Sequence, residues 1–316
     1  MGNSRRPTGT HMETEQALEN TLVSVVVGTY NSAKFILDTL ESVKAQTYQH
    51  LELIVSDDNS RDDTLSLCRQ WLSVNEGRFV RTEIITTSEN TGIVANANRA
   101  VKAVRGKWIK LLGGDDLLLP RCIESNMNLQ ARYPDNHLFV SKIISFDSET
   151  GRDLAVMPRH AIENNNGKEQ LRGLLKGHYV KAPGVFISKF LVDKLGGFDP
   201  RYPMFEDDPF WIKANLAGYY FVENPEVLVR YRIHNQALSN APGRFINPIF
   251  YPSFKSFKQE VVCPLLKRQG MYRDLFYIKG RLWLSDRILR KGNKLEAWQN
   301  AFERVAYKML RLVAGT

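Results

Sequence analysis

Two adjacent aspartates, Asp115 and Asp116, follow an apolar stretch of the chain and are preceded by two glycines. Carboxylate oxygens bind Mg²⁺ and Mn²⁺, and a metal held beside a nucleotide can neutralise its phosphate oxygens. A Gly-Asp-Asp tripeptide also occurs in palm-type polymerases, where it lies in a hairpin between strands. Here a leucine run of helical character, residues 117–119, and Pro120 follow, which disfavours the polymerase interpretation.

A second acidic cluster, Glu206-Asp207-Asp208, places three carboxylates side by side. Mutual repulsion and partial burial raise the pKa of at least one member of such a cluster, which suits a general base. The alternative is a helix N-terminus, where negative charge is stabilised without any catalytic role. These residues alone leave both interpretations open.

His234 ends a stretch in which Arg230 and Arg232 occupy alternating positions. Alternate residues of a strand share one face, so the three side chains are expected on the same side of the chain. Binding of phosphate or metal is one interpretation. A surface strand with solvated charges is the other.

Hydrophobic patterning identifies the elements that must position these residues. Buried strands are predicted over residues 22–27, 51–55, 83–86 and 108–112, with helices between them. This alternation predicts an α/β fold with a parallel sheet covered by helices. In the second half, a mobile polar loop is predicted at 164–167, a helix over 211–217 and a strand over 227–231.

Polar side chains stand where three of the predicted strands end. They are Thr29 and Tyr30, Asp57 and Asp58, and Asp115 and Asp116. Ligands of such sheets bind outside the carboxyl ends of the strands. Asp after a strand is also an ordinary turn former and helix cap. Convergence of three pairs on one edge favours a binding site.

The composition is that of a soluble globular protein, with 43% hydrophobic and 24% charged residues in a chain of 316. No run approaches the roughly 18 apolar residues of a membrane span. Three cysteines without a C-x-x-C pattern favour a reducing compartment and argue against a zinc site. Hydrolase and dinucleotide or P-loop motifs are absent. Residues 1–12 resemble an expression tag, so residues 1–20 are expected to lie outside the fold. The same segment has no apolar export signal, and the protein is therefore expected in the cytoplasm.

Residues 241–316 form a basic region, with 15 of the 43 lysines and arginines but only 5 of the 34 acidic residues. An amphipathic helix is predicted over 296–313, its apolar face made of Trp298, Phe302, Val305, Met309 and Leu312. One interpretation is a helical subdomain that packs on the rest of the chain, or on a second copy in a homodimer. The other is binding to an anionic membrane surface, where each basic residue contributes roughly 1 kcal/mol. Nucleic acid is disfavoured because no nucleic-acid-binding motif is present.

Taken in order, seven short segments between residues 23 and 239 resemble those of the family 2 glycosyltransferases of the GT-A fold. They are the strand and Tyr-Asn turn at 24–31, S-x-x-x-Q-T at 42–48, E-hydrophobic-D-D at 52–60, N-x-G…N at 90–98, the stretch 106–109 before the D-x-D position, G-G-F-D…E-D…W at 196–211, and Y-R-x-H at 231–234. The resemblance implies a Rossmann-like, mostly parallel sheet flanked by helices over residues 21–240. A helical C-terminal extension would follow over residues 241–316.

The resemblance also implies roles for single residues. The nucleotide sugar would contact Thr29, Tyr30, Asp58, Gly92, Asn98, Asp115 and Asp116. Asp115 would take the place of the metal-binding last aspartate of D-x-D, with His234 in reach of the metal or the diphosphate. The metal would be Mn²⁺ or Mg²⁺. Asp207 would be the catalytic base, and Glu206 would support the acceptor side.

Three positions depart from the family pattern. Gly113 replaces the first aspartate of D-x-D, so one contact to ribose or to metal-bound water is missing, and the neighbouring Asp116 is the residue expected to compensate. Asn59 stands where the family usually has glycine, and Ala97 where it often has arginine. These departures affect the geometry of donor binding and leave the reaction class unchanged.

The implied function is inverting transfer of a hexosyl or N-acetylhexosaminyl group from a UDP-sugar to a saccharide hydroxyl. Its setting would be the synthesis of a bacterial surface polysaccharide, such as O-antigen, capsule or exopolysaccharide. A lipid-linked acceptor would agree with peripheral binding to the inner face of the cell membrane. One alternative is a non-catalytic member that only binds a nucleotide sugar, which Gly113 favours. A nucleotidyltransferase is the other, but it would need a glycine-rich phosphate loop that residues 28–31 do not provide.

Overall fold

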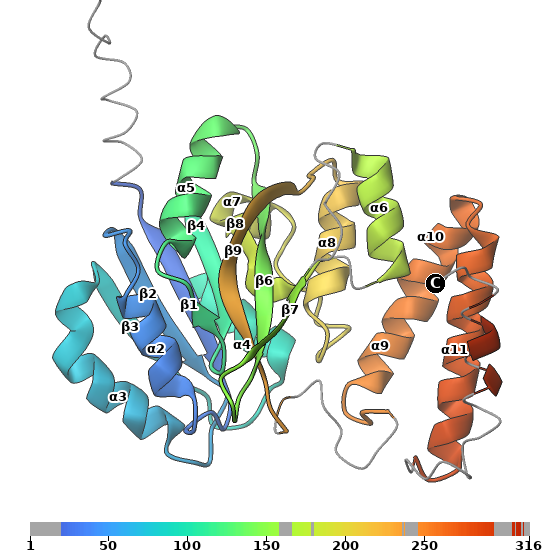
Figure 1. The fold of residues 1–316 in the computed structure, drawn as a ribbon, viewed down its shortest axis with the longest axis horizontal. Coiled ribbons are helices and arrows are strands. Elements are labelled where there is room, and N and C mark those ends of the chain that lie inside the picture. Colours follow the sequence, from blue (N-terminus) through green and yellow to red (C-terminus); the bar gives the residue numbers. More distant parts are fainter. Residues whose placement is uncertain are drawn as a thin grey trace, which may run out of the picture.

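The computed structural model describes residues 20–157, 166–177, 180–235, 237, 246–293, 305, 306, 308–310 and 312. Figure 1 shows a twisted central sheet with helices packed on its faces and a group of C-terminal helices beside it. Within these described ranges, the sheet has nine strands in the order β3-β2-β1-β4-β8-β6-β9-β5, with β7 paired to β6. The α/β fold predicted from the sequence is confirmed.

The bounds of the elements are as follows. The strands are β1 (Val23–Thr29), β2 (Leu51–Asp57), β3 (Arg81–Ile85), β4 (Trp108–Gly113), β5 (Leu117–Leu118), β6 (Leu138–Asp147), β7 (Asp153–Met157), β8 (Val185–Ser188) and β9 (Val222–Ile233). The helices are α2 (Ile36–Lys44), α3 (Thr64–Asn75), α4 (Ile93–Ala103), α5 (Cys122–Arg132), α6 (Gly167–Lys176), α7 (Lys189–Lys194), α8 (Asp207–Leu216), α9 (Tyr251–Phe257), α10 (Cys263–Arg268) and α11 (Tyr272–Arg290). Short turns of helix are η1 (Glu76–Arg78), η2 (Ala182–Gly184) and the π-helical η3 (Lys258–Val262).

The first half of the sheet is parallel, because β1 pairs in parallel with both β2 and β4, and β2 with β3. β1, β2 and β4 are buried on both faces, whereas the edge strand β3 is half-buried. In β1, Val23, Val25 and Val27 contribute to one hydrophobic cluster and Val26 to the other. This period-two division explains the unbroken apolar runs in the sequence. The carboxyl ends of β1, β2 and β4 therefore meet at one edge, the lower edge in Figure 1.

The second half of the sheet brings β9 to the same edge. β8 pairs antiparallel with β4 and β6, and β9 runs parallel to β6. The two-residue strand β5 pairs antiparallel with β9, so the chain directly after Asp116 is tied to β9. As a result, residues more than a hundred positions apart in sequence, around 115 and 232, become neighbours.

Several sequence-based boundaries need correction. The leucine run at 117–119 is not helical: Leu117–Leu118 forms β5, since the Leu119 N–H donates to the Leu228 carbonyl at 2.9 Å and extends the pairing with β9. β9 begins five residues before the predicted strand over 227–231. α8 begins at Asp207, four residues earlier than predicted, which places the acidic cluster in its first turn. Asn166 caps α6 by accepting a hydrogen bond from the Glu169 N–H, while 164 and 165 lie outside the described residues.

The C-terminal helices share a hydrophobic core with the sheet domain. The ring of Phe205 lies 5.2, 6.0 and 5.3 Å from the rings of Phe250, Phe254 and Phe257. Figure 1 shows α9 and α10 beside α6 and α8. Most of the amphipathic helix predicted over 296–313, including Trp298 and Phe302, lies outside the described residues, as do residues 1–19 of the expected tag. In the described part of the chain, no helix is both long enough and apolar enough to span a membrane.

Candidate active site

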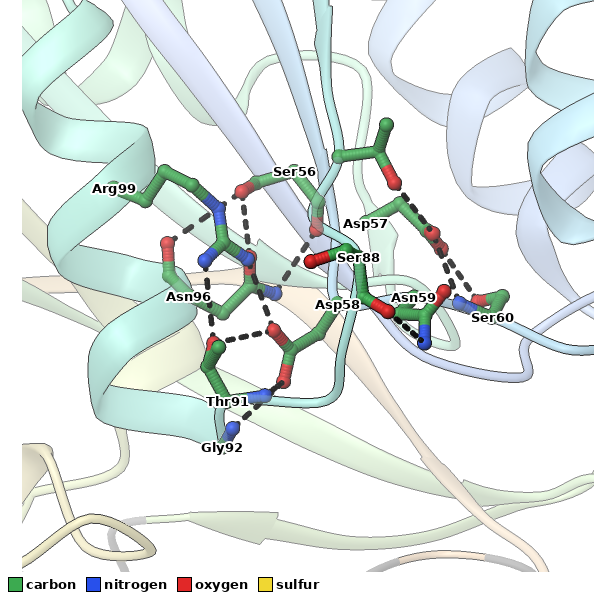
Figure 2. Close-up of polar contacts among 11 residues, drawn as sticks. Ser56, Asp57, Asp58, Asn59, Ser60, Ser88, Thr91, Gly92, Asn96 and Arg99 are labelled. Atoms are coloured by element: carbon green, nitrogen blue, oxygen red, sulfur yellow. Dashed lines mark hydrogen bonds and ion pairs between the residues drawn. The ribbon is translucent and has the colours of Figure 1, made fainter.

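Asp58, directly after β2, is the centre of a hydrogen-bond network (Figure 2). Its carboxylate accepts bonds from the backbone N–H groups of Thr91 (2.9 Å) and Gly92 (2.7 Å) and from the Thr91 hydroxyl (2.6 Å). Arg99 Nη2 adds an ion pair at 2.9 Å. Burial alone would raise the pKa of Asp58, but these bonds outweigh it and hold the pKa below its usual value. Asp58 thus stays ionised and fixes the loop that starts α4.

Gly92 connects this network to the segment that precedes the acidic cluster. Its φ of 88° lies in the region that favours glycine, and a Cβ built there would lie 3.2 Å from the Pro203 carbonyl oxygen. The Val94 N–H donates to the same carbonyl at 3.1 Å. The predicted donor residue Gly92 therefore has a clear structural role in joining the two halves of the site.

Thr29 and Tyr30, at the end of β1, differ in accessibility. Tyr30 is 38% exposed, so its ring is available to a ligand, whereas Thr29 is only 3% exposed. Among the described residues the Thr29 hydroxyl has no hydrogen-bond partner, and a Cβ built at Gly114 would lie 2.7 Å from it. At this edge of the sheet, Thr29 is therefore buried and Tyr30 lies at the surface.

Asn59 departs from the family's glycine without a change of backbone shape. Its φ is 63°, in the left-handed region, which asparagine tolerates better than other residues with a side chain. Its Nδ2 donates to the Ser88 carbonyl at 3.2 Å (Figure 2). The substitution therefore keeps the turn after β2.

Asp115 and His234 meet at the carboxyl edge of the sheet, as the sequence suggested. His234 Nε2 lies 2.9 Å from Asp115 Oδ2, and the Asp115 side chain is one-third exposed. The His234 ring packs against Phe35 with a centroid separation of 4.5 Å. A carboxylate and an imidazole directed at each other can share one divalent cation, with further positions left for phosphate and water oxygens.

The two arginines of β9 both have acidic partners, Arg232 in the interior and Arg230 at the surface. Arg232 is 6% exposed; its Nε donates to the Asp115 carbonyl at 2.7 Å, and Nη2 pairs with Asp38 at 3.0 Å. Arg230 pairs with Asp153 at 2.8 Å. Both guanidinium groups stack on the Phe146 ring, at 4.8 and 4.2 Å, which confirms that they share one face. Arg232 thereby fixes the backbone of Asp115.

Asp116 does not replace the missing aspartate of the D-x-D pattern. It is 2% exposed, and its Oδ1 accepts a hydrogen bond from the Arg232 backbone N–H at 2.9 Å. Burial, followed by the charge of Asp115, raises its pKa well above the usual value. Asp116 therefore points into the protein and anchors β9, and the donor contact predicted for it is corrected to a structural role.

Gly113, three residues before Asp116, leaves space for the Asp115 carboxylate. A Cβ built at Gly113 would lie 2.6 Å from Asp115 Oδ1. A side chain at this position would displace the Asp115 carboxylate from its place beside His234. The departure from D-x-D is therefore coupled to the present orientation of Asp115.

Asn98 bonds to the protein backbone through both ends of its amide. Its Nδ2 donates to the Phe198 carbonyl at 2.8 Å, and its Oδ1 accepts from the Phe198 N–H at 2.9 Å. Gly197, at a φ of 75°, would place a Cβ 2.6 Å from that Oδ1. Asn98 thus holds the Gly-Gly-Phe-Asp loop against α4, and its donor contact stays a prediction.

The acidic cluster lies at the start of α8. It has features of both sequence interpretations, a helix N-terminus and a group of carboxyls with raised pKa values. The Asp208 N–H donates to Asp207 Oδ1 at 2.8 Å, as at a helix N-terminus. Burial and the adjacent Asp207 charge raise the pKa of Glu206 to about 8, and burial also raises the pKa values of Asp207 and Asp208. Raised carboxyl pKa values suit proton acceptance near neutral pH.

Sequence reasoning missed two basic residues at the site. Arg99 binds Asp58, Thr91 and Asn96, and it follows Asn98 instead of preceding it as in the family pattern. Lys258, in the C-terminal region, ends 3.7 Å from Asp208 Oδ2. The displaced arginine could have been noticed beside Ala97, whereas nothing local marks Lys258 among fifteen basic residues.

Comparison with known proteins agrees with this geometry. The family model described as Glycosyl transferase family 2 matches residues 24–196. An uncharacterized glycosyltransferase of Methanocaldococcus jannaschii is 28% identical over 69% of this chain and 73% of its own length. One of Haemophilus influenzae is 27% identical over 87% and 83%. A putative glycosyltransferase of Bacillus subtilis, EpsE, is 28% identical over 43% and 48%.

Among solved structures, the chain resembles residues 1–349 of S. aureus TarS in complex with UDP-GlcNAc. The TM-score is 0.54 at 16% identity, covering 93% of this chain and 90% of that one. A complex of the same TarS fragment with UDP gives a TM-score of 0.51 at 15% identity and the same coverage. The likeness supports the GT-A architecture, including C-terminal helices after the sheet domain. With its ordered motifs, its strand-end carboxylates and a family match over more than half its length, this chain belongs to glycosyl transferase family 2.

Proposed function

We propose that the protein is an inverting, metal-dependent glycosyltransferase that moves a sugar from a UDP-sugar to a hydroxyl of a saccharide acceptor. The observation that carries this proposal is the Asp115 carboxylate facing the His234 imidazole at 2.9 Å, at the sheet edge where nucleotides bind in such folds. The acidic cluster at the start of α8 belongs to the same catalytic domain.

The proposed nucleotide is UDP. Tyr30 offers an exposed ring on which a base can stack, and Asp58, whose N–H donates to the Thr29 carbonyl at 2.9 Å, keeps an ionised carboxylate in the next loop. The similar TarS structures contain UDP and UDP-GlcNAc. These two observations favour a UDP-hexose or UDP-N-acetylhexosamine as donor.

Mn²⁺ or Mg²⁺ would be held by Asp115 and His234. Hard carboxylate oxygen with one imidazole nitrogen is a donor set that these ions accept, and two protein ligands leave room for the diphosphate. When bound, the ion would neutralise charge that develops on the leaving diphosphate. Arg232 would keep Asp115 in place through its bond to the Asp115 carbonyl.

Asp207 would act as general base on the acceptor hydroxyl. As the C–O bond to UDP breaks, the acceptor oxygen attacks the anomeric carbon from the opposite face, and its proton passes to the Asp207 carboxylate. One displacement of this kind inverts the configuration, so an α-linked donor gives a β-linked product. The raised pKa of Asp207 favours its role as a proton acceptor.

The proposed setting is the synthesis of a bacterial surface polysaccharide, such as O-antigen, capsule or exopolysaccharide. A saccharide acceptor linked to a lipid would bring the enzyme to the inner face of the cell membrane from the cytoplasm.

An exposed stripe on α11 supports such peripheral binding. Tyr272, Phe276 and Trp283 are 64%, 56% and 51% exposed, and Lys279 and Arg290 follow the same face of the helix. Aromatic and basic side chains together suit an anionic lipid surface. Sedimentation with anionic liposomes at low salt tests this point: full-length protein should bind, and Phe276→Ala/Trp283→Ala should bind less. A wild-type protein that ignores the liposomes would leave this face for a second copy of the chain.

Calorimetric titration of UDP with and without Mn²⁺ tests the main proposal. Affinity should rise with the metal, and UDP-GlcNAc should then release UDP slowly in the presence of water. Tight UDP binding without any turnover of UDP-sugars, for a range of acceptors, would instead favour the non-catalytic member of the family, an alternative supported by Gly113.

A further inference from the structure

Lys258 belongs to the C-terminal helices, yet its side chain ends beside the acidic cluster of the sheet domain. The residue is 4% exposed, and Nζ lies 3.7 Å from Asp208 Oδ2, an ion pair longer than a hydrogen bond. Within the described residues Nζ has no hydrogen-bond partner. Burying an ammonium group without hydrogen bonds costs folding free energy. We therefore looked for a function that this location of Lys258 serves.

The helix that carries Lys258 is distorted at this residue. α9, η3 and α10 follow one another without a break from Tyr251 to Arg268, and Lys258 starts the π-helical turn. Such turns insert a residue into a helix and are frequent at functional sites. Here the turn begins at the one lysine of this helix that reaches the cluster.

Among the described residues, the ion-pair partner of Nζ is Asp208. The rings of Phe254 and Phe257 lie 5.3 and 5.2 Å away on the same helix. A Cβ built at Gly177, at the end of α6, would lie 3.6 Å from Nζ. Aromatic rings and backbone thus enclose the ammonium, and Asp208 provides its ion-pair partner.

The charges around the cluster come from four elements. Glu206, Asp207 and Asp208 supply the negative charges at the start of α8. Lys258 and Lys181, the latter preceding η2, lower the pKa values of Asp207 and Asp208, which burial raises. Burial, and to a smaller extent Arg281 on α11, lower the pKa of Lys258 itself, whereas Asp208 and Asp207 raise it. Two adjacent buried carboxylates tend to share a proton unless a cation offsets their repulsion.

We propose that Lys258 is a positioning residue of the acceptor site, whose ammonium supplies the counter-charge for the Asp207–Asp208 pair and so makes the C-terminal helices part of the catalytic machinery. The inference rests on the proposed role of Asp207 as base. A base must be free of its proton when the acceptor arrives. Lys258 meets this requirement by stabilising the doubly ionised pair.

Carboxyl ¹³C NMR titration of the full-length protein, labelled at aspartate, tests the inference without any donor. Signals are assigned with Asp207→Asn and Asp208→Asn. In Lys258→Met, the carboxyl groups of Asp207 and Asp208 should titrate at least about one pH unit higher than in the wild type, because a pair of charges near 4 Å interacts strongly even when partly screened. Lys258→Arg, which keeps the charge, should titrate close to the wild type.

The pH dependence of turnover in the same variants is a second test. UDP release from UDP-GlcNAc with Mn²⁺ should show an acidic limb of kcat that moves to higher pH in Lys258→Met, with about tenfold lower kcat at pH 6.5 and an unchanged Kd for UDP. If Lys258→Met does not fold, the double variant Lys258→Met/Asp208→Asn removes both charges together, a change that proteins often tolerate. Its Asp207 titration should return toward that of the wild type, whereas Asp208→Asn alone should titrate lower.

Unshifted Asp207 and Asp208 titrations in Lys258→Met, or an Asp207 titration in the double variant equal to that of Asp208→Asn alone, would overturn the inference and leave Lys258 a packing residue. Failure of the proposed function looks different. In that case Asp207→Asn turns over donor at the wild-type rate, whatever the titrations show.

Discussion

The sheet edge proposed to bind the donor and the acidic cluster proposed to serve the acceptor, called here the donor edge and the acceptor side, hold their carboxylates in different ways. At the donor edge, Asp58 has three hydrogen bonds from the neighbouring loop and an ion pair with Arg99. On the acceptor side, Asp207 and Asp208 have one bond within the cluster and an ion pair at 3.7 Å. The first arrangement lowers the pKa of Asp58 and keeps its carboxylate ionised. The second leaves carboxyl groups with raised pKa values, which suits the proposed base catalysis.

Replacement of Asp207 should have the largest effect. Asp207→Asn is nearly isosteric, and removal of a general base typically costs about 10²–10⁴ in rate. Turnover should fall by that factor, while calorimetric UDP affinity with Mn²⁺ stays near the wild-type value because the donor edge is intact.

Asp208→Asn is the matched control for Asp207, since it changes the neighbouring carboxylate in the same way. Its loss of turnover should be far smaller. An inactive Asp208→Asn beside an active Asp207→Asn would place the base one residue further along the chain.

At the donor edge, Asp115→Ala should abolish the increase in UDP affinity that Mn²⁺ produces. The loss is expected to be at least about 10–100-fold, the range seen when only the outer-shell partners of metal ligands are mutated. Asp116→Asn should keep the metal effect, because an amide oxygen can still accept the bond from the Arg232 N–H. Equal UDP affinity with and without metal in the wild-type protein would exclude Asp115 as a ligand.

Asn98→Ala tests the connection between the two sides. It removes both bonds to the Phe198 backbone, which should lower the free energy of unfolding by about 1–3 kcal/mol. Loss of the loop position should also reduce turnover by about tenfold, with little change in UDP affinity. A variant weakened chiefly in UDP binding would support the donor contact predicted for Asn98.

Arg99→Met should have the smallest effect, on the pH dependence of stability. Asp58 has a lowered pKa in the folded protein, so its contribution is present above pH 3.8 and is lost as the pH falls through the folded-state pKa. Without Arg99 that pKa rises toward the unfolded value, and denaturation curves between pH 5 and pH 3 should depend less steeply on pH. At pH 7 the cost should be about 1 kcal/mol, since three other bonds to Asp58 remain.

Much of the donor edge could be predicted from the sequence, because strand ends, Asp58 and Asp115 depend on local patterns. The family resemblance assigned both Asp115 and His234 to one metal, and the two side chains do lie 2.9 Å apart. Asn98 was assigned to the ligand through the family segment at 90–98, and Asp116 as the neighbour expected to compensate for Gly113. Whether a polar side chain points to solvent or to backbone depends on contacts such as those with Arg232 and Phe198, more than 90 residues away. Lys258 was missed for the same reason.

The hydrophobic core that crosses between sheet and C-terminal helices has a consequence for how the chain comes apart. Buried residues from β8, α8, α9 and α11 belong to one continuous cluster, so residue 240 does not separate two independently stable pieces. Melting should be a single cooperative event, in which the C-terminal helices and the sheet lose structure at the same temperature. A protease that cuts near residue 240 would then leave two fragments that remain associated until both unfold.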